Sequence, residues 1–479
     1  MKMIRRMLTL FAVAALLATA CSASDDDETA TGGTDDQTTT TAAPVDDGGD
    51  DEPATTAAPV DDGGDDAPAE ISTDFGVTED SIRIGLSADL TGIFSGLTTV
   101  IVDGYKAYFD RVNENGGIGG RDVEVVVLDS GYDVATHIEN YAELSEESDS
   151  GVVMIGNSTG SPHTSAIAQD LVDDDMLAVP LSWYSGWADQ DFGGNVFELY
   201  TNYCFEGMNG VEFLAQQHPE PNPTIAIVSL PGEYGQDGAT GAKIAADALG
   251  LEIVYDGEGA IAGDDFTPII TQLVGASPDL VWITSSPSQL AQILGGAAAQ
   301  GLTAQWGGTN PSYNGLLLST EVAPALDAFY TVSGYAALYA SNDEPGMVDL
   351  MTEMEARLPD LTWAQIDATV FAWTEAIFAE AVLTQAAENG DLTRAGVLAA
   401  AGEVEVDFQG LSPDQQWFGS LNDFVVRESY LYDVSVADAT PTLTHLEEGS
   451  SGLIQLAGPF LGDVAAGYEF NEPCFVSEG

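Results

Sequence analysis

The stretch from Ser81 to Asp129 constrains the fold most, because it reads as a strand, a helix and a second strand in succession. Residues 82–86 are mostly apolar, and apolar residues then recur at helical spacing over residues 100–112. Asn115-Gly116-Gly117 ends that helix, since glycine readily adopts the left-handed conformation needed there. The β-branched run at 123–128 follows. This unit predicts parallel strands joined by a right-handed crossover.

Two further strands each end in a polar loop that contains glycine. The buried runs at 152–155 and 177–180 lead into residues 156–161 and 181–187, and we expect a helix to begin near Pro162. In an open α/β sheet, ligands bind beyond the carboxyl ends of the strands. These loops therefore predict a binding site along one edge of the first sheet.

A second set of strand and helix units begins near residue 201. We expect the chain to return to the first set at about Asn310, and the long segment at 364–387 to pack there as an amphipathic helix. This order predicts an α/β fold of two doubly wound lobes with parallel central sheets, joined by three crossings that form a hinge. The predicted lobes comprise residues 75–200 with 312–425, and residues 201–311 with 426–479.

The N-terminus reads as a secretory signal. A short basic segment precedes the apolar residues 7–17, and Ala18-Thr19-Ala20 then leads to Cys21. We expect residues 1–20 to be removed and Cys21 to carry a lipid, although the small residues also suit ordinary signal cleavage. Residues 21–74 are acidic and contain the sequence TTAAPVDDGGDD twice, so we expect them to form an unfolded tether.

The chain contains three cysteines. If Cys21 is lipidated, Cys204 and Cys474 remain as a pair in an oxidising compartment. If it is not, a secreted protein keeps an odd thiol. We predict a disulfide between Cys204 and Cys474.

The protein is strongly acidic, with a formal net charge of −67. Residues 22–74 hold 17 acids and no base, so the part from Phe75 onward, here called the body, holds 61 acids and eight bases and has a charge near −53. Such a field repels nucleic acid and anionic lipid surfaces, and we expect neither as a partner.

Part of the chain resembles a known family. Ile84-Gly85, Thr91-Gly92, Gly104-Tyr105 and the segment from Asn113 to Arg121 are similar to the opening of the branched-chain amino-acid binding proteins of ABC importers. The resemblance runs with gaps from about Ile82 to Tyr432. It implies a type I periplasmic-binding fold and an exported, monomeric lipoprotein on the outer face of the cytoplasmic membrane. Such a protein captures a small solute and delivers it to permease and ATPase subunits.

The resemblance also implies roles for individual residues. Ser158, Thr159 and Ser185 match positions that hold the amino-acid carboxylate, and Tyr234 matches a tyrosine at the cleft in the other lobe. Asp264 lies near a family acid that neutralises the ligand's ammonium, and Asp265 is an equal candidate. The full set of predicted ligand-binding residues is Thr91, Asn157, Ser158, Thr159, Trp183, Tyr184, Ser185, Tyr234, Asp264 and Ser285.

The residue types in the predicted cleft limit the solute. None of the body's eight bases falls in the predicted cleft loops, so no arginine can clamp a carboxylate or phosphate there. Aromatic residues gather near these loops, and Trp183 and Tyr184 stand where the family prefers small side chains. We therefore predict a neutral or zwitterionic solute, such as an amino acid or an amide, rather than a branched-chain amino acid in particular. The aromatic residues near the cleft are Trp183, Tyr184, Trp187, Tyr203, Tyr234 and Tyr313.

Two alternatives belong to other functional classes. Residues 156–160 fit the Gly-x-Ser-x-Gly elbow of a serine hydrolase, with Ser158 as nucleophile and either Asp264 or Asp433 as the acid before His445. A third hypothesis is a ligand sensor that docks on a membrane receptor. The four histidines are scattered and no Cys-x-x-Cys occurs, so we expect neither a metal nor a cofactor.

Overall fold

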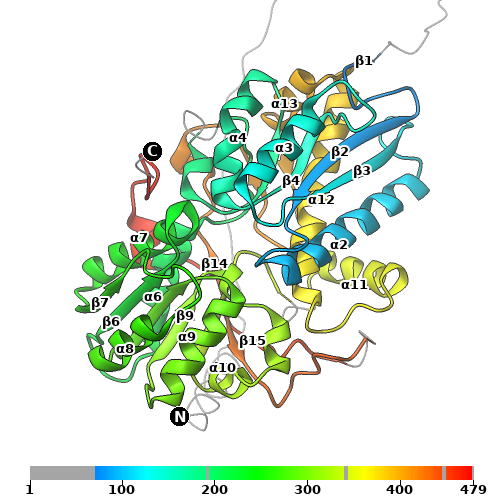
Figure 1. Ribbon diagram of the computed structural model, residues 1–479. Coiled ribbons are helices and arrows are strands. Elements are labelled where there is room, and N and C mark those ends of the chain that lie inside the picture. The colour runs from blue at the N-terminus through cyan, green and yellow to red at the C-terminus, as the bar shows by residue number, and fades with distance from the viewer. Residues whose placement is uncertain (1–70, 190–193, 339–342, 445–448, 477–479) are drawn as a thin grey trace, which may run out of the picture. The chain divides into compact units, whose positions relative to one another are not determined.

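The computed structural model describes residues 71–189, 194–338, 343–444 and 449–476. Cys21 and His445 lie outside these ranges, as do the predicted signal and nearly all of the tether. Figure 1 shows two α/β lobes, which are described in turn below.

The first lobe contains a four-stranded sheet in which all neighbouring strands pair in parallel. Its order is β3-β2-β4-β5, and its strands are β2 (Ser81–Ala88), β3 (Asp122–Asp129), β4 (Met154–Thr159) and β5 (Ala178–Leu181). The helices between them are α2 (Ser95–Glu114), α3 (Val134–Ser145) and α4 (Ser161–Asp173). Strands β4 and β5 are buried along their whole length, although β4 ends in the polar residues Asn157, Ser158 and Thr159. The strand–helix–strand unit predicted at Ser81–Asp129 is confirmed.

The second lobe is built on a seven-stranded sheet with the order β15-β14-β10-β9-β8-β6-β7. Its parallel strands are β6 (Ile225–Ser229), β7 (Ile253–Gly257), β8 (Leu280–Thr284), β9 (Gln305–Gly308) and β10 (Tyr330–Gly334). Two antiparallel strands complete one side, β14 (Ser429–Val434) and β15 (Leu453–Phe460). The helices of this lobe are α6 (Tyr203–Gln217), α7 (Gly232–Leu249), α8 (Thr267–Ala276), α9 (Pro287–Ala299) and α10 (Ala323–Phe329).

The chain crosses between the lobes after β5, after β10 and before β14, so the predicted architecture of two lobes joined by three crossings is confirmed. The predicted return at about Asn310 is wrong, because β10 pairs in parallel with β9. Residues 312–334 therefore belong with the second sheet, although we assigned them to the first lobe.

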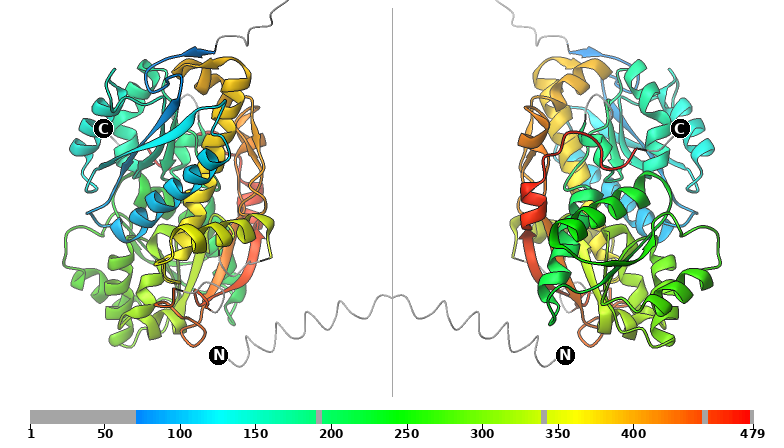
Figure 2. Two further views of the ribbon diagram at one scale, coloured as in Figure 1. Left: turned by 90° about the vertical axis from the view of Figure 1, so that its right-hand side faces the viewer. Right: turned by 90° about the vertical axis from the view of Figure 1, so that its left-hand side faces the viewer.

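After β10 the chain adds α11 (Pro345–Arg357), α12 (Ile366–Glu388) and α13 (Arg394–Ala401) to the first lobe. Helix α12 lies beside α2 in Figures 1 and 2, and a Cβ atom at Gly104 of α2 would stand 2.8 Å from the Cβ of Ala372. The predicted helix on the first lobe is confirmed, but residues 368–376 of α12 are all buried, so the helix is not amphipathic over these turns. The helix has neighbours on every side over these turns and needs no polar face there.

Smaller elements complete the described chain. They are β1 (Ser72–Thr73), β11 (Asp391–Leu392), β12 (Glu405–Val406), β13 (Gln415–Gln416), α14 (Leu421–Phe424), α15 (Asp463–Gly467) and the 3-10 helices η1 (Ser185–Ala188), η2 (Asn310–Ser312) and η3 (Gly315–Ser319). Cys204 and Cys474 form the predicted disulfide, with their Cα atoms 6.3 Å apart. Within the described ranges, no helix has the length and apolar character needed to span a bilayer.

Candidate functional site

A cavity lies between the two lobes, at the carboxyl ends of the strands of the first sheet. Its volume is about 20 Å³, roughly the space of one water molecule. The first lobe contributes Phe94, Leu97, Thr98, Tyr132, Thr159, Gly160, Ser161, Leu181 and Trp183, and the second contributes Tyr203, Tyr234 and Pro311. Any larger solute therefore requires the lobes, or the side chains at their junction, to move apart.

Each strand of the first sheet delivers a lining residue through the loop that follows it. Phe94 comes after β2, Tyr132 after β3, Gly160 after β4 and Trp183 after β5. Parallel strands bring these four loops to one edge, although the residues are separated by up to 89 positions in the sequence. This is the edge that the sequence predicted as the binding site.

Five aromatic residues of the cavity form a continuous chain of ring contacts across the two lobes. The ring centroids are 4.9 Å apart for Tyr132 and Phe94, and 6.2 Å apart for Phe94 and Tyr234. They are 4.7 Å apart for Tyr234 and Tyr203, and 6.1 Å apart for Tyr203 and Trp183. Tilted and edge-to-face pairs at these distances are favourable arrangements of aromatic rings.

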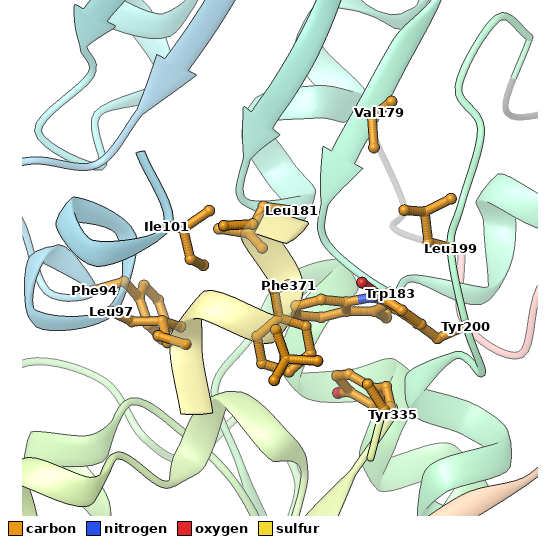
Figure 3. Packing of buried hydrophobic residues seen from close by; sticks show 14 of the residues in the cluster. Phe94, Leu97, Ile101, Val179, Leu181, Trp183, Leu199, Tyr200, Tyr335 and Phe371 are labelled. Atoms are coloured by element: carbon orange, nitrogen blue, oxygen red, sulfur yellow. The ribbon is translucent and has the colours of Figure 1, made fainter. Parts of the chain in front are cut away.

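The indole of Trp183 is fixed by a second layer of aromatic rings (Figure 3). Its ring centroid lies 4.4 Å from that of Tyr335, 5.5 Å from that of Phe371 and 6.2 Å from that of Tyr200. Trp183 is only 2% exposed, and among the described residues no acceptor lies within hydrogen-bond distance of its Nε1. The side chain is therefore held by packing and not by a hydrogen bond.

The hydroxyl groups of two lining threonines already use their protons inside the protein. Thr98 donates to the backbone carbonyl of Asp89. Thr159 donates to the side-chain oxygen of Asn157 over 2.8 Å, and Asn157 donates to Glu375 over 2.9 Å. Burial raises the pKa of the Glu375 carboxyl to about 8. The two threonine oxygens consequently offer lone pairs, and not protons, to a molecule in the cavity.

No Asp, Glu, His, Lys or Arg side chain is found among the described residues that line the cavity. Two carboxylates lie farther out, those of Asp89 and Glu233. Burial raises the pKa of the Tyr132 phenol above its usual range, and the charges of Asp89 and Glu233 raise it further. Asp89 accepts the backbone N–H groups of Gly92 and Phe94. Two carboxylates therefore lie near the cavity, although no ionisable acid or base is found among the described residues that line it.

The structure brings three of the predicted ligand-binding residues to the cavity, namely Thr159, Trp183 and Tyr234. A fourth, Ser285, contributes its backbone carbonyl, which accepts the Tyr234 hydroxyl over 2.8 Å. That bond orients the tyrosine ring, so Ser285 supports the wall of the cavity.

Asn157 and Ser158 lie inside β4 and are buried. The Ser158 hydroxyl is 3.1 Å from Nε2 of His137 and 2.8 Å from the hydroxyl of Thr164. Burial lowers the pKa of His137 to about 3, which makes it a weak base, and its Nδ1 faces the Ser87 hydroxyl rather than an acid. The nucleophile elbow considered as an alternative does not form, because Ser158 is a paired strand residue and not the tip of an exposed turn.

Tyr184 and Ser185 contact the C-terminal segment rather than the cavity. The Tyr184 hydroxyl donates to the backbone carbonyl of Phe475 over 2.5 Å, and Ser185 donates its N–H and its hydroxyl to Asp237 over 3.0 and 2.6 Å. Burial raises the pKa of Asp237 to about 7, against the hydrogen bonds that lower it. The backbone N–H of Cys474 donates to Ser185, so the disulfide and this network hold the same segment.

The remaining predicted residues lie on the surface. Thr91 is exposed and donates to Asp129 over 2.9 Å. Asp264 and Asp265 are exposed in the loop before α8, where Asp265 accepts the backbone N–H of Thr267. None of the three lines the cavity, and their roles toward a solute stay predictions.

Sequence reasoning missed most of the cavity wall. Phe94 and Tyr132 follow strands of the first sheet, so their position after a strand was an available signal. Leu181 ends β5 and had been placed in a predicted loop, and Tyr203 had been named among the aromatic residues near the cleft. Pro311 and Thr98 carried no such signal. The described ranges contain no group of three or more His, Cys, Asp or Glu side chains that could hold a metal ion.

Comparisons with known proteins agree with this arrangement. The family model described as "Periplasmic binding protein" matches residues 81–440. A leucine-, isoleucine-, valine-, threonine- and alanine-binding protein of Pseudomonas aeruginosa is 24% identical over 240 residues, and the match covers 49% of this chain and 61% of that protein.

Two solved structures share the fold. A fatty acid ABC transporter substrate-binding protein from Thermomonospora curvata is 27% identical with a TM-score of 0.73, covering 84% of this chain and 97% of that one. A branched chain amino acid ABC transporter protein from Thermus thermophilus with bound valine is 18% identical with a TM-score of 0.68, covering 81% of this chain and 98% of that one.

Proposed function

Because the chain belongs to the periplasmic binding protein family, we propose that it is the solute receptor of an ABC importer. It captures a small molecule in the cavity between its lobes and presents it to a permease driven by ATPase subunits. The observation that carries this proposal is the composition of the cavity, whose wall is supplied by both lobes. A solute held there gains contacts from both sides only when the lobes close, and a membrane partner can recognise the closed form.

The similar proteins support a small solute but not one particular solute. The Pseudomonas aeruginosa protein is named for five amino acids, and the Thermomonospora curvata protein for fatty acids. Since one fold serves both, the solute depends on the side chains that line each cavity.

Deletion of the gene in the source organism tests the import function. A compound that the purified protein binds is radiolabelled for this test. Its uptake should fall to background in the deletion strain and return when the gene is restored. Unchanged uptake would refute the importer. A loss of solute-induced transcription without a loss of uptake would instead support the sensor that we considered as an alternative.

We further propose that a lipid on Cys21 anchors the receptor to the outer face of the cytoplasmic membrane. Cells fed an alkyne-labelled fatty acid should label the wild-type protein, whereas Cys21→Ser should abolish the label and release the protein into the soluble fraction. Labelling that survives Cys21→Ser would refute the anchor.

A further inference from the structure

The cavity wall combines many aromatic rings with no ionised side chain. Rings from both lobes contact one another in series from Tyr132 to Trp183, as described above. The faces of such rings carry negative partial charge, and several of them together stabilise a cation placed among them. The wall is therefore suited to a positive group with an apolar surface.

Several other groups near the cavity also favour a cation, whereas the Trp183 Nε1–H and the N-terminus of α4 at Ser161 favour an oxygen acceptor elsewhere on the solute. Thr98 and Thr159 present lone pairs, since their protons are already donated. Asp89 and Glu233 lie close enough to raise the pKa of Tyr132, and the body as a whole carries a charge near −53. No lysine or arginine of the described chain lines the cavity. A carboxylate placed here would have no counter-charge, whereas a cation would be stabilised.

The kind of cation follows from what the wall lacks. A primary ammonium carries three N–H donors and needs acceptors for them, usually including a carboxylate. No carboxylate lines this cavity, so a primary ammonium would find only neutral oxygens as acceptors and no counter-charge. A quaternary ammonium has no N–H group, so its methyl groups can lie against ring faces without leaving a donor unpaired.

We propose that the cavity is an aromatic cage for a quaternary ammonium group, formed by Phe94, Tyr132, Trp183, Tyr203 and Tyr234. This inference rests on the proposed function of the cavity as the solute site. It departs from the neutral or zwitterionic solute predicted from the sequence, because it requires only that the solute carry a methylated, permanently positive nitrogen. Because the cage rings come from both lobes, closure of the lobes would complete it.

Calorimetry with matched probes tests the cage on the ligand-stripped protein. Choline and 3,3-dimethylbutan-1-ol have the same shape, but only choline carries the charge. We expect choline to bind at least tenfold more tightly than this neutral isostere, and also more tightly than ethanolamine, its primary-amine counterpart. Equal binding of the isostere, or tighter binding of ethanolamine, leucine or hexanoate than of choline, would overturn the inference. Binding of any of these other probes would leave the solute-receptor function standing.

Ring substitutions locate the effect in the cavity. Tyr132→Leu and Tyr203→Leu remove a cage ring and should each weaken choline binding at least fivefold, whereas Tyr132→Phe and Tyr203→Phe keep the ring and should stay within about twofold of wild type. Tyr313→Leu is a matched control, because Tyr313 is a buried tyrosine that does not line this cavity. Melting curves confirm that each variant folds. A Leu variant that folds and binds choline as wild type does would refute the cage.

Discussion

Replacing Glu375 by glutamine should make the protein more stable, by an amount that depends on pH. Glu375 lies in α12, is 1% exposed and accepts a hydrogen bond from Asn157 over 2.9 Å. Burial raises the pKa of its carboxyl from 4.5 to about 8 in the folded protein. Glutamine has nearly the same shape, keeps an oxygen for Asn157 and cannot ionise.

The sign follows from proton linkage. Because the folded pKa is the higher one, the folded state keeps its proton between pH 4.5 and about 8 while the unfolded state loses it. The free energy of unfolding of the wild type therefore falls as the pH rises through this window, by about 3 kcal/mol at pH 7 and about 5 kcal/mol above pH 8. Glu375→Gln should remove this loss. For a folded body of about 400 residues, about 3 kcal/mol corresponds to roughly 4 °C in melting temperature.

Calorimetric melting of both proteins at pH 4 and pH 7 measures the effect. We expect equal melting temperatures at pH 4 and a higher one for Glu375→Gln at pH 7. Glu388→Gln, on the exposed last turn of the same helix, is the control and should change little at either pH. A Glu375→Gln effect that is the same at both pH values, or a destabilised variant at pH 7, would show that this carboxyl is not held neutral by burial.

Three further results are expected. Gly210→Ala should destabilise the protein by about 3 kcal/mol, because the new Cβ would stand 2.1 Å from the Trp282 ring. Gly275→Ala, on an exposed turn of α8, should instead stabilise the protein by about 0.5 kcal/mol. Chemical denaturation measures both changes, and equal effects of the two substitutions would contradict this prediction. Thiol titration of the unfolded, non-reduced body should find Cys204 and Cys474 unreactive, and two free thiols would disprove the bond. Reduction should lower the free energy of unfolding by up to about 5 kcal/mol, because the bond joins residues 270 positions apart. Raising the salt concentration should raise the melting temperature through screening of the net charge near −53, and a salt-independent value would show that self-repulsion is unimportant.

The sequence by itself determined the local units and the edge at which the site lies. β-branched runs, glycine stops and helical spacing are local signals, and they located β2, α2 and β3 closely. The rule that parallel strands present their carboxyl ends together then identified loops that line the cavity. Trp183 could be named in advance from its place in such a loop, whereas Thr159 and Tyr234 were named because they match positions of the family that the chain resembles.

Only the tertiary structure decided which strand pairs with which, and which side chain of a loop faces inward. The short run of β10 reads alike in either lobe, and its pairing with β9 placed it in the second sheet. Ser158 and Thr159 are neighbours on β4, yet only Thr159 lines the cavity, since successive strand residues point to opposite faces. The contacts that build the aromatic cage join residues far apart in sequence, such as Phe94 and Tyr234. Such contacts depend on the packing of one lobe against the other, and no local pattern in the chain encodes them.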